Sequence, residues 1–394
     1  MINIFKKKRK LEEERKEMEM KYKITGDIDY GYIYANDYIN IIHDACSICY
    51  GRNTERTYEE RRDYVRRRSN HESISEHSNI ILYYKFTKEL LEEVLDVVQC
   101  FKYLNYKIRK KDDYICMLVG GSSRGYKEAI RAIENTDNKF YRAFLNSLYY
   151  IDKCLMEDFI KDEILNEFDH IPTTEEEYKP KRLGKTTIVN LDNMDLIEER
   201  IKTFDLPFTS DDLMKFFTIT IKFEEVSRAI SQQLIRHRAG VTQASQRYIN
   251  YSDAKFYSPD MFKPEKYDKN KKYEITFKGT KKELTLQELG QAIISIYPQM
   301  IEQGLLKEDA RAFLPNNTET SLYMTFTLWG LIKFLELRTD AHAQKEIQLI
   351  ALELEDFIKD KFQGKDIYYH ILPAYKKIPK ELEQEYDNID EVIE

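Results

Sequence analysis

The densest group of side chains that could do chemistry is Arg236-His237-Arg238, which is followed by Ser245 and Arg247. Guanidinium groups bind phosphate oxygens bidentately, and a nearby imidazole and hydroxyl offer further hydrogen-bonding groups. This combination predicts a site for a bound dianion, such as the phosphate of a nucleotide. A basic helix C-terminus whose arginines face water or pair with nearby acids would show the same residues, since the helix dipole favours cations there.

The elements around this group follow from periodicity. Residues from Phe216 to Phe223 alternate with strand period, and we expect a helix from Glu224 that ends at Gly240. Polar groups would continue an otherwise apolar face of that helix. The residues spaced to share this face are Val226, Ile230, Gln233 and His237.

Three further motifs carry polar side chains. Upstream, His71-Glu-Ser73-Ile-Ser-Glu76-His77 lies between an arginine-rich helical stretch and a strand-like run from Asn79 to Phe86. Downstream stands Ala310-Arg311-Ala-Phe-Leu-Pro315. The last motif, Leu335 to Ile347, puts Arg338 and His342 at helical intervals from Leu331 and Leu335. An arginine that extends from a packed helix and a surface histidine would explain that last pattern equally well.

Composition excludes several classes of protein. The 394 residues are 42% hydrophobic and 33% charged, which indicates a folded chain, and the net charge of −7 argues against a protein that coats nucleic acid. No run approaches the roughly 18 apolar residues of a membrane span, and no secretory signal is evident, so we expect a cytoplasmic protein without a membrane partner. The five cysteines, which include Cys46 and Cys49, are expected to be reduced, and no metal site is expected.

The chain divides by pattern into a core and additions to it. Residues 1–34 form a charged N-terminal arm, 35–88 and 215–370 the core, 89–214 a mostly helical insertion, and 371–394 an acidic tail. A hairpin is expected near 253–281. The expected fold class is α+β, with mixed helix and sheet.

The four motifs, in this order, resemble those of the flavin-dependent thymidylate synthases. That family has Arg-His-Arg, seven intervening residues, then Ser, commonly continuing to Arg-Tyr, whereas the spacer here is six residues. The turn from His71 to His77 is similar to the family's flavin-contacting turn, and the segment from Ala45 to Tyr50 to the helix before it. The resemblance implies the family's mixed helix and sheet fold for the core.

The resemblance also implies roles for individual residues. Arg338 would be the chief catalytic side chain, because it corresponds to an arginine that favours negative charge on the uracil ring. The residues implied to bind dUMP are Gln233, Arg236, Gln243, Ser245, Arg247, Arg311 and Arg338. The residues implied to contact FAD are Cys49, His71, Ser73, Glu76, Arg236, His237, Arg238 and His342.

The activity implied is the methyltransferase reaction that makes dTMP from dUMP in nucleotide biosynthesis. Methylenetetrahydrofolate would donate the carbon and NADPH would reduce the FAD, whose hydride would complete the methyl group without a cysteine nucleophile. The family's homotetramers share active sites between subunits, which implies a homotetramer here.

Departures from the family pattern leave alternatives open. Thr327, Trp329 and Lys333 stand where family members often have Asn, Arg and Asn, and the segment Gly120–Ile130 is faintly similar to that lost helix start. A catalytically inactive relative with a regulatory role is therefore one alternative. A P-loop kinase is another, suggested by Gly184-Lys185-Thr186, but Lys179 stands where its earlier glycine would be required.

Overall fold

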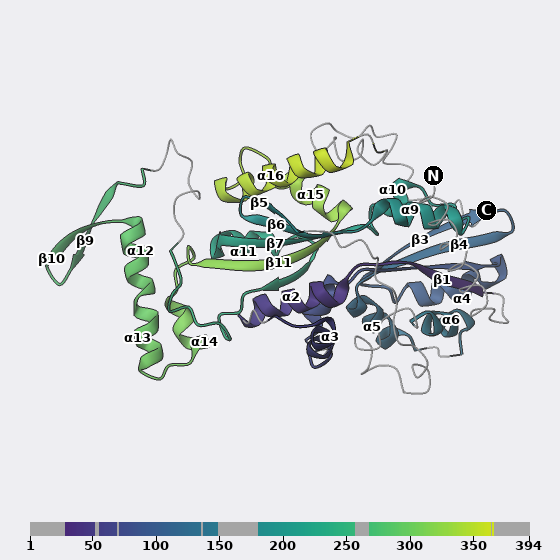
Figure 1. Cartoon of the computed structure of the whole chain (residues 1–394), viewed down its shortest axis with the longest axis horizontal. Helices are drawn as coiled ribbons and strands as arrows, with labels where there is room; N and C mark the ends of the chain where they lie inside the picture. The colour runs from purple at the N-terminus through teal and green to yellow at the C-terminus, as the bar shows by residue number, and fades with distance from the viewer. Residues whose placement is uncertain are drawn as a thin grey trace.

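A computed structural model of the chain shows two antiparallel sheets with helices packed against them, and a long hairpin that extends to one side (Figure 1). The structure describes residues 28–51, 55–68, 71–134, 137–148, 180–256, 268–363 and 365. The expected acidic tail, most of the expected charged arm, and Cys154 lie outside these residues.

The first sheet has four strands within the described residues, in the order β1-β2-β4-β3, and every neighbouring pair is antiparallel. Alternate residues of β2 enter two different cores: Leu82 and Tyr84 pack in the first, Ile81 and Tyr83 in the second. Both faces of the strand are covered, so its sequence is an almost continuous apolar run. The strands are β1 (Ile28–Ala35), β2 (Ile80–Phe86), β3 (Leu104–Lys111) and β4 (Tyr114–Gly121).

Helices of the N-terminal half cover this sheet. Helix α2 ends at Tyr50 and is capped by Gly51, whose φ of 66° is a left-handed conformation that glycine adopts without steric cost. Helix α3 begins with a capping box between Thr57 and Glu60. The elements are α2 (Tyr38–Tyr50), α3 (Tyr58–Arg66), η1 (Glu72–His77), η2 (Lys88–Leu90), α4 (Leu91–Val98), α5 (Ser123–Ala132) and α6 (Lys139–Ser147).

The second sheet has five strands within the described residues, in the order β5-β6-β7-β11-β8. The expected strand after Phe216 is confirmed, but the expectation that a helix starts at Glu224 is wrong. Strand β7 continues to Ser227, because Val226 and Ser227 pair with β11 and the Glu224 amide bonds to the Lys185 carbonyl at 2.9 Å. The strands are β5 (Lys181–Leu183), β6 (Thr186–Leu191), β7 (Thr218–Ser227), β8 (Gly240–Gln243) and β11 (Glu319–Thr327).

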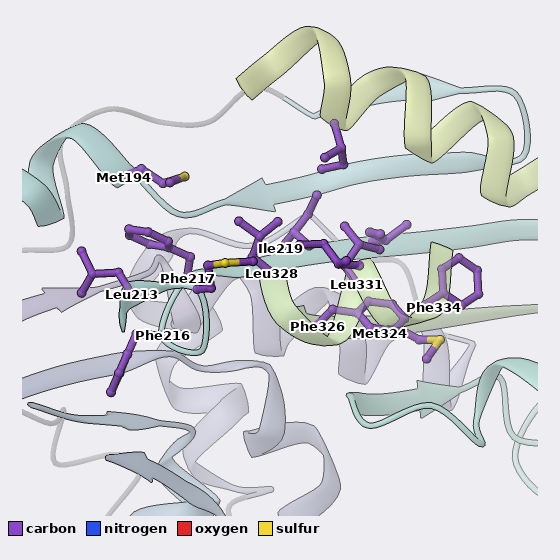
Figure 2. Close-up of a cluster of buried hydrophobic side chains, with 14 of the residues drawn as sticks. Met194, Leu213, Phe216, Phe217, Ile219, Met324, Phe326, Leu328, Leu331 and Phe334 are labelled. Carbon is purple, nitrogen blue, oxygen red and sulfur yellow. The ribbon is translucent and has the colours of Figure 1, made fainter. Parts of the chain in front are cut away.

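The second core lies between this sheet and the helices α15 and α16, which Figure 1 shows running along it. Figure 2 shows Ile219, Met324, Phe326 and Leu331 of this core gathered around β7 and β11. The helices of this half are α9 (Met194–Thr203), α10 (Ser210–Leu213), α11 (Arg228–Leu234), α15 (Leu328–Arg338) and α16 (Lys345–Phe362).

The expected hairpin forms, but at residues 272–285. Strands β9 (Lys272–Phe277) and β10 (Thr280–Thr285) meet in a turn in which Lys278 and Gly279 both have positive φ. The hairpin projects away from both sheets (Figure 1). The elements that lead back from it are α12 (Leu286–Ile294), α13 (Ile296–Glu302), α14 (Lys307–Ala310) and η6 (Arg311–Phe313).

The α+β class is confirmed, and strands reach beyond the segments assigned to the core. Residues 28–34, grouped with the charged arm, belong to β1, and residues 89–214 supply β3 and β4 to one sheet and β5 and β6 to the other. The division into core and insertion remains a prediction. Among the described helices, none combines the length and the apolar character that crossing a membrane requires.

Candidate functional site

The turn η1 lies directly against β8, and this contact brings two predicted motifs together. A Cβ added at Gly240 would lie 2.7 Å from the Glu76 carbonyl oxygen, which is closer than real Cβ contacts. Gly240 therefore permits the close approach of the two segments. The expectation that Gly240 ends a helix is wrong, because α11 ends at Leu234 and Gly240 begins β8.

His77 fixes this arrangement from inside. Its ring is fully buried, with Nδ1 2.9 Å from the Thr325 hydroxyl and Nε2 2.9 Å from the Thr242 hydroxyl. Burial lowers the pKa of His77 to about 3, so the ring is neutral at pH 7. His77 thus joins η1 to β8 and β11 by hydrogen bonds rather than by charge.

A cleft of about 330 Å³ opens beside this contact. It gathers seven of the residues that the sequence predicts for the ligand site, from four separate segments of the chain. An adjoining hollow of about 590 Å³ shares Arg247 and Tyr248 with it. The predicted residues that line the cleft are Cys49, His71, Ser73, Gln243, Ser245, Arg247 and Arg311.

Three arginines give the cleft its chemistry. Arg228, the first residue of α11, lines it, and its Nη1 is buried with no hydrogen-bond partner among the described residues. Burial lowers the pKa of Arg228, an effect that Tyr251 opposes and the charge of Arg311 strengthens. The Arg247 Nε donates to the Glu308 carboxylate, and the Arg311 Nε donates to the Glu308 backbone carbonyl, both at 3.1 Å.

Arg228 was not among the residues predicted from the sequence. A helix expected from Glu224 puts Arg228 inside an element, whereas in the structure Arg228 is the first residue of α11. The signal that could have found it is Ser227, whose side chain caps α11 by accepting from the Ile230 amide at 3.2 Å. A Ser-Arg pair at a strand-to-helix junction puts the arginine at the end of the sheet.

A second cluster forms around Arg338, at the end of α15. Its Nε donates to Nε2 of His237 at 3.1 Å, and its Nη1 to the side-chain oxygen of Gln233 at 3.4 Å. Burial, with the charge of Arg338, lowers the pKa of His237 to about 4, so the imidazole is neutral and accepts this bond. Burial and the charge of Arg236 lower the pKa of Arg338 as well. None of these residues lines the 330 Å³ cleft.

Four predicted residues neither line the cleft nor form a hydrogen bond with Arg338 in the described structure. Arg236 and Arg238 are exposed in the loop after α11. Glu76 pairs with Arg124 of α5, and burial raises the pKa of Glu76 against the opposing effect of that charge. The expectation that His342 continues the face of the Arg338 helix is wrong. Helix α15 ends at Arg338, and the almost fully exposed His342 ring bonds to Asp340 at 2.8 Å.

Three of the described thiols are poor nucleophiles. Cys46, Cys49 and Cys116 are buried, and burial raises the pKa of each, that of Cys46 to about 12. A thiol reacts as its thiolate, so these residues are protonated and unreactive at neutral pH. Cys49 borders the cleft, where it packs rather than reacts.

Residues 187–362 match the model of a family described as thymidylate synthase complementing protein. A flavin-dependent thymidylate synthase from Geobacter sulfurreducens is 30% identical over 175 residues, which are 42% of this chain and 70% of that protein. The enzyme of the same name from Thermosipho africanus is 36% identical over 136 residues, 34% of this chain and 59% of that protein. That from Sulfolobus acidocaldarius is 35% identical over 141 residues, 36% and 49% respectively.

The matches to several of these relatives span about half to three fifths of the relatives' own length. The Geobacter sulfurreducens match covers more than two thirds of that protein, and the family model covers the chain from β6 to α16. The chain belongs to the flavin-dependent thymidylate synthase family.

Proposed function

We propose that this chain converts dUMP to dTMP, using FAD as cofactor, methylenetetrahydrofolate as carbon donor and NADPH as reductant. The observation that carries the proposal is the arginine-lined cleft between η1 and β8. Arg228 holds a desolvated guanidinium nitrogen without a partner there, and Arg311 lies close enough to perturb it. A desolvated guanidinium nitrogen without a hydrogen-bond partner is costly, and a phosphate would relieve that cost by pairing with both arginines.

The donors of the cleft fit a nucleotide. Ser245 and Gln243 line it beside the arginines, and Gln243 is held by a bond from its Nε2 to the Ser231 hydroxyl at 2.9 Å. His71, which precedes η1 as its N-cap, and Ser73 of η1 line the same cleft. The Tyr50 hydroxyl lies 3.2 Å from Nδ1 of His71 and holds that ring in place. In the proposal, His71 and Ser73 contact the cofactor and the residues of β8 and its following loop contact dUMP.

Arg338 is proposed to stabilise negative charge on the pyrimidine. Its guanidinium is oriented by His237 and Gln233. Because His237 is neutral, the positive charge here comes from Arg338 and the neighbouring Arg236. When bound, reduced FAD supplies the hydride, so the protein's task is alignment and charge stabilisation. Arg236, Arg238, Glu76 and His342 remain proposed cofactor contacts.

The family resemblance further implies active sites shared between subunits of a homotetramer, and we include shared sites in the proposal. Arg338 and His237 do not line the cleft, which is consistent with a ligand held between chains. A second chain would bring the two groups to one ligand.

The test is made on purified protein. We expect a flavin absorption band in the visible range, and dTMP formation only when dUMP, methylenetetrahydrofolate and NADPH are all present. Colourless protein that FAD cannot reconstitute would contradict the proposal. Flavin-containing protein without turnover would favour the inactive regulatory relative. The features that motivate this alternative are the six-residue spacer of the signature and the departures at Thr327 and Trp329, whose ring lies 5.1 Å from the Lys333 ammonium.

A further inference from the structure

The two sheets are connected in the same way. The consecutive strands β1, β2, β3 and β4 take the spatial order β1-β2-β4-β3, and β6, β7, β8 and β11 take the order β6-β7-β11-β8, with β5 added at the outer edge. All pairs are antiparallel. Helices follow at equivalent points: α2 and α9 after the first strand, α4 and α11 after the second, α5 and α15 after the fourth.

Matching hydrogen bonds occur where the first strand of each sheet meets the second. The amide of Asn36 donates to the Asn79 carbonyl at 3.0 Å, and the Asn79 amide donates to the Asn36 side chain at 2.9 Å. The amide of Asp192 donates to the Thr218 carbonyl at 3.1 Å, and the Thr218 amide donates to the Asp192 side chain at 2.7 Å. A reciprocal pair of this kind is a specific local structure, and the chain forms it twice.

The helices after the fourth strands also begin alike. The Ser122 hydroxyl accepts from the Gly125 amide at 3.2 Å, and the Thr327 hydroxyl from the Gly330 amide at 3.1 Å. Each glycine faces a carbonyl of the segment that leads into the third strand: an added Cβ would lie 2.7 Å from that of Tyr103 or 3.1 Å from that of Arg238. In both halves a glycine near the start of this helix faces the backbone carbonyl at the equivalent position.

Contacts between the halves occur in reciprocal pairs. His77 of the first half bonds to Thr325 of the second, and in the opposite sense Phe216 packs on Gly120, whose added Cβ would lie 2.7 Å from the ring. Figure 2 shows Phe216 pointing away from Phe217 and toward the first sheet. These contacts relate the halves as two subunits of a symmetric dimer would be related.

A second reciprocal pair of contacts involves Glu76 and Lys215, the residues directly before His77 and Phe216. Gly240 approaches the Glu76 carbonyl, and in the opposite sense Asn105 donates its side-chain amide to the Lys215 carbonyl at 2.9 Å. Glu76 and Lys215 each directly precede the residue of the first pair. The position equivalent to the cleft therefore lies between α10 and β3.

The two halves have kept different functional residues. Counting back from Asn105, the equivalent of Gly240, the first half has Phe101-Lys102-Tyr103 where the second has Arg236-His237-Arg238. Counting back from Lys215, the second half has Asp212 where the first has Ser73. Each half has lost the motif that the other retains.

Internal ion pairs close the equivalent position. Asp212, whose side chain is 2% exposed, accepts from Arg109 at 2.8 and 3.2 Å and lies 3.6 Å from Lys107. A cleft of about 500 Å³ remains near the far end of β3, but its two lysines are engaged. Lys85 bonds to the Phe204 carbonyl at 2.8 Å and Lys111 to that of Asp205 at 3.0 Å.

We propose that residues 28–148 and 180–363 are two diverged copies of one folding unit, which together form one ligand site per chain. The first copy contributes the turn η1 and the second contributes the arginine-rich segment, while the equivalent position between α10 and β3 is closed. This inference rests on the proposed function only for the identity of the ligands, FAD and dUMP.

Binding stoichiometry is the first test. FAD content is measured against protein concentration, and dUMP is titrated into the FAD-loaded protein by calorimetry. We expect one FAD and one dUMP per chain. Two of either ligand per chain would overturn the inference and leave the proposed function intact. If the protein binds neither FAD nor dUMP, both the proposed function and the ligand site inferred here would be overturned.

A matched pair of substitutions exchanges the closing residue. Ser73→Asp places a carboxylate in the open cleft at a position proposed to contact the cofactor, where Ala244 stands in the place of Arg109. The carboxylate would repel the phosphates of FAD and compete with them for the arginines of the cleft, so we expect FAD binding to weaken by about tenfold or more. Asp212→Asn removes the charge from the closed position and should leave one FAD per chain, bound within about twofold of the parent. Circular dichroism and thermal melting establish that both variants are folded. Equal loss of FAD from both would overturn the assignment.

Discussion

The side chains that distinguish this site are arginines whose surroundings were not evident from their sequence motif. Arg236 and Arg238, in the most recognisable motif, are exposed, whereas Arg228 at the start of α11 is desolvated and lacks a partner for Nη1 among the described residues. The sequence identified Arg311 and Arg247 but not Glu308. The Glu308 backbone carbonyl bonds to Arg311, and its carboxylate bonds to Arg247. Burial and hydrogen-bond partners depend on the fold, so residue types alone do not reveal them.

Arg311→Ala is expected to weaken dUMP binding while leaving FAD binding nearly unchanged. A charge-assisted hydrogen bond to phosphate contributes roughly 1.5–3 kcal/mol, or about 10- to 150-fold in Kd. Calorimetric titration with dUMP and with deoxyuridine measures the effect, and the loss should appear only with dUMP. Arg142→Ala, at a side chain of α6 that is 65% exposed, is the matched control. Equal loss of dUMP and FAD affinity in the Arg311 variant would contradict the assignment.

Two strands of the sheets and the hairpin were predicted from the sequence, whereas β1, β3 to β6, β8, β11 and several joins between elements were not. The runs at 80–86 and 218–223 were correct because apolar alternation and β-branched residues mark them locally. The helix expected from Glu224 failed because β11, almost a hundred residues later, extends the pairing of β7 to Ser227. Gly240 reads as a helix end from its sequence, yet its role is to admit the Glu76 backbone. Long-range pairing outweighed local propensity at both places.

Gly240→Ala should separate β8 from η1. A methyl group 2.7 Å from the Glu76 carbonyl forces the backbone to shift, at a cost of about 1–3 kcal/mol typical of overpacking. We expect a lower midpoint of thermal unfolding and weaker FAD binding. Gly279→Ala, in the open hairpin turn with φ of 79°, should cost about 1–2 kcal/mol through backbone strain but leave FAD affinity unaltered. Unchanged FAD binding in the Gly240 variant would show that this contact does not shape the site.

His77 should make the fold sensitive to acid. Its pKa is about 3 when folded, against 6.5 as the ordinary value, so below pH 6.5 the unfolded chain takes up a proton that the folded chain refuses. Stability therefore falls by about 1.4 kcal/mol for each pH unit between 6.5 and 3 on account of this residue. Asp192 opposes it, since burial raises the pKa of that carboxyl to about 6.

The effect of His77 is measured by comparing the pH dependence of unfolding in the parent protein and in His77→Gln. Denaturant unfolding of the flavin-free parent and of His77→Gln, measured from pH 7.5 to 5, should give a flatter pH dependence for the variant. The exposed His342, changed to Gln, is the matched control and should follow the parent. Parallel curves for parent and His77→Gln would mean that His77 is charged in the folded chain.

At the scale of the whole molecule, the pattern of motifs identified the family, whereas the duplication left one faint trace in the sequence, the similarity of Gly120–Ile130 to the helix start before Arg338. The equivalent residues pair Asn36 with Asp192 and His77 with Phe216, so identity has been lost while hydrogen bonds and contacts persist. The segment 89–214 reads as an insertion because it begins inside one copy and ends inside the next. The repeat lies mainly in strand order and hydrogen bonds rather than in residue identity, so it is found from the coordinates.

The duplication changes the expected assembly. If the family's shared sites require four folding units, two chains of this protein supply them. Mass measurement in solution should therefore give a particle of about twice the chain mass of 47.2 kDa. A four-chain particle would restore the homotetramer implied by the family resemblance and show that each pair of copies acts as a single subunit. The measurement is made at several protein concentrations, so that dissociation is distinguished from a smaller assembly.

The central claim is that this chain methylates dUMP through FAD rather than through a thiol. Turnover by a variant in which all five cysteines are changed to serine or alanine tests it most directly. We expect dTMP formation within about tenfold of the parent, a margin of about 1.4 kcal/mol for packing, whereas Arg338→Ala should lose far more. A folded, FAD-loaded cysteine-free variant with no turnover, restored by returning one particular thiol, would contradict the account.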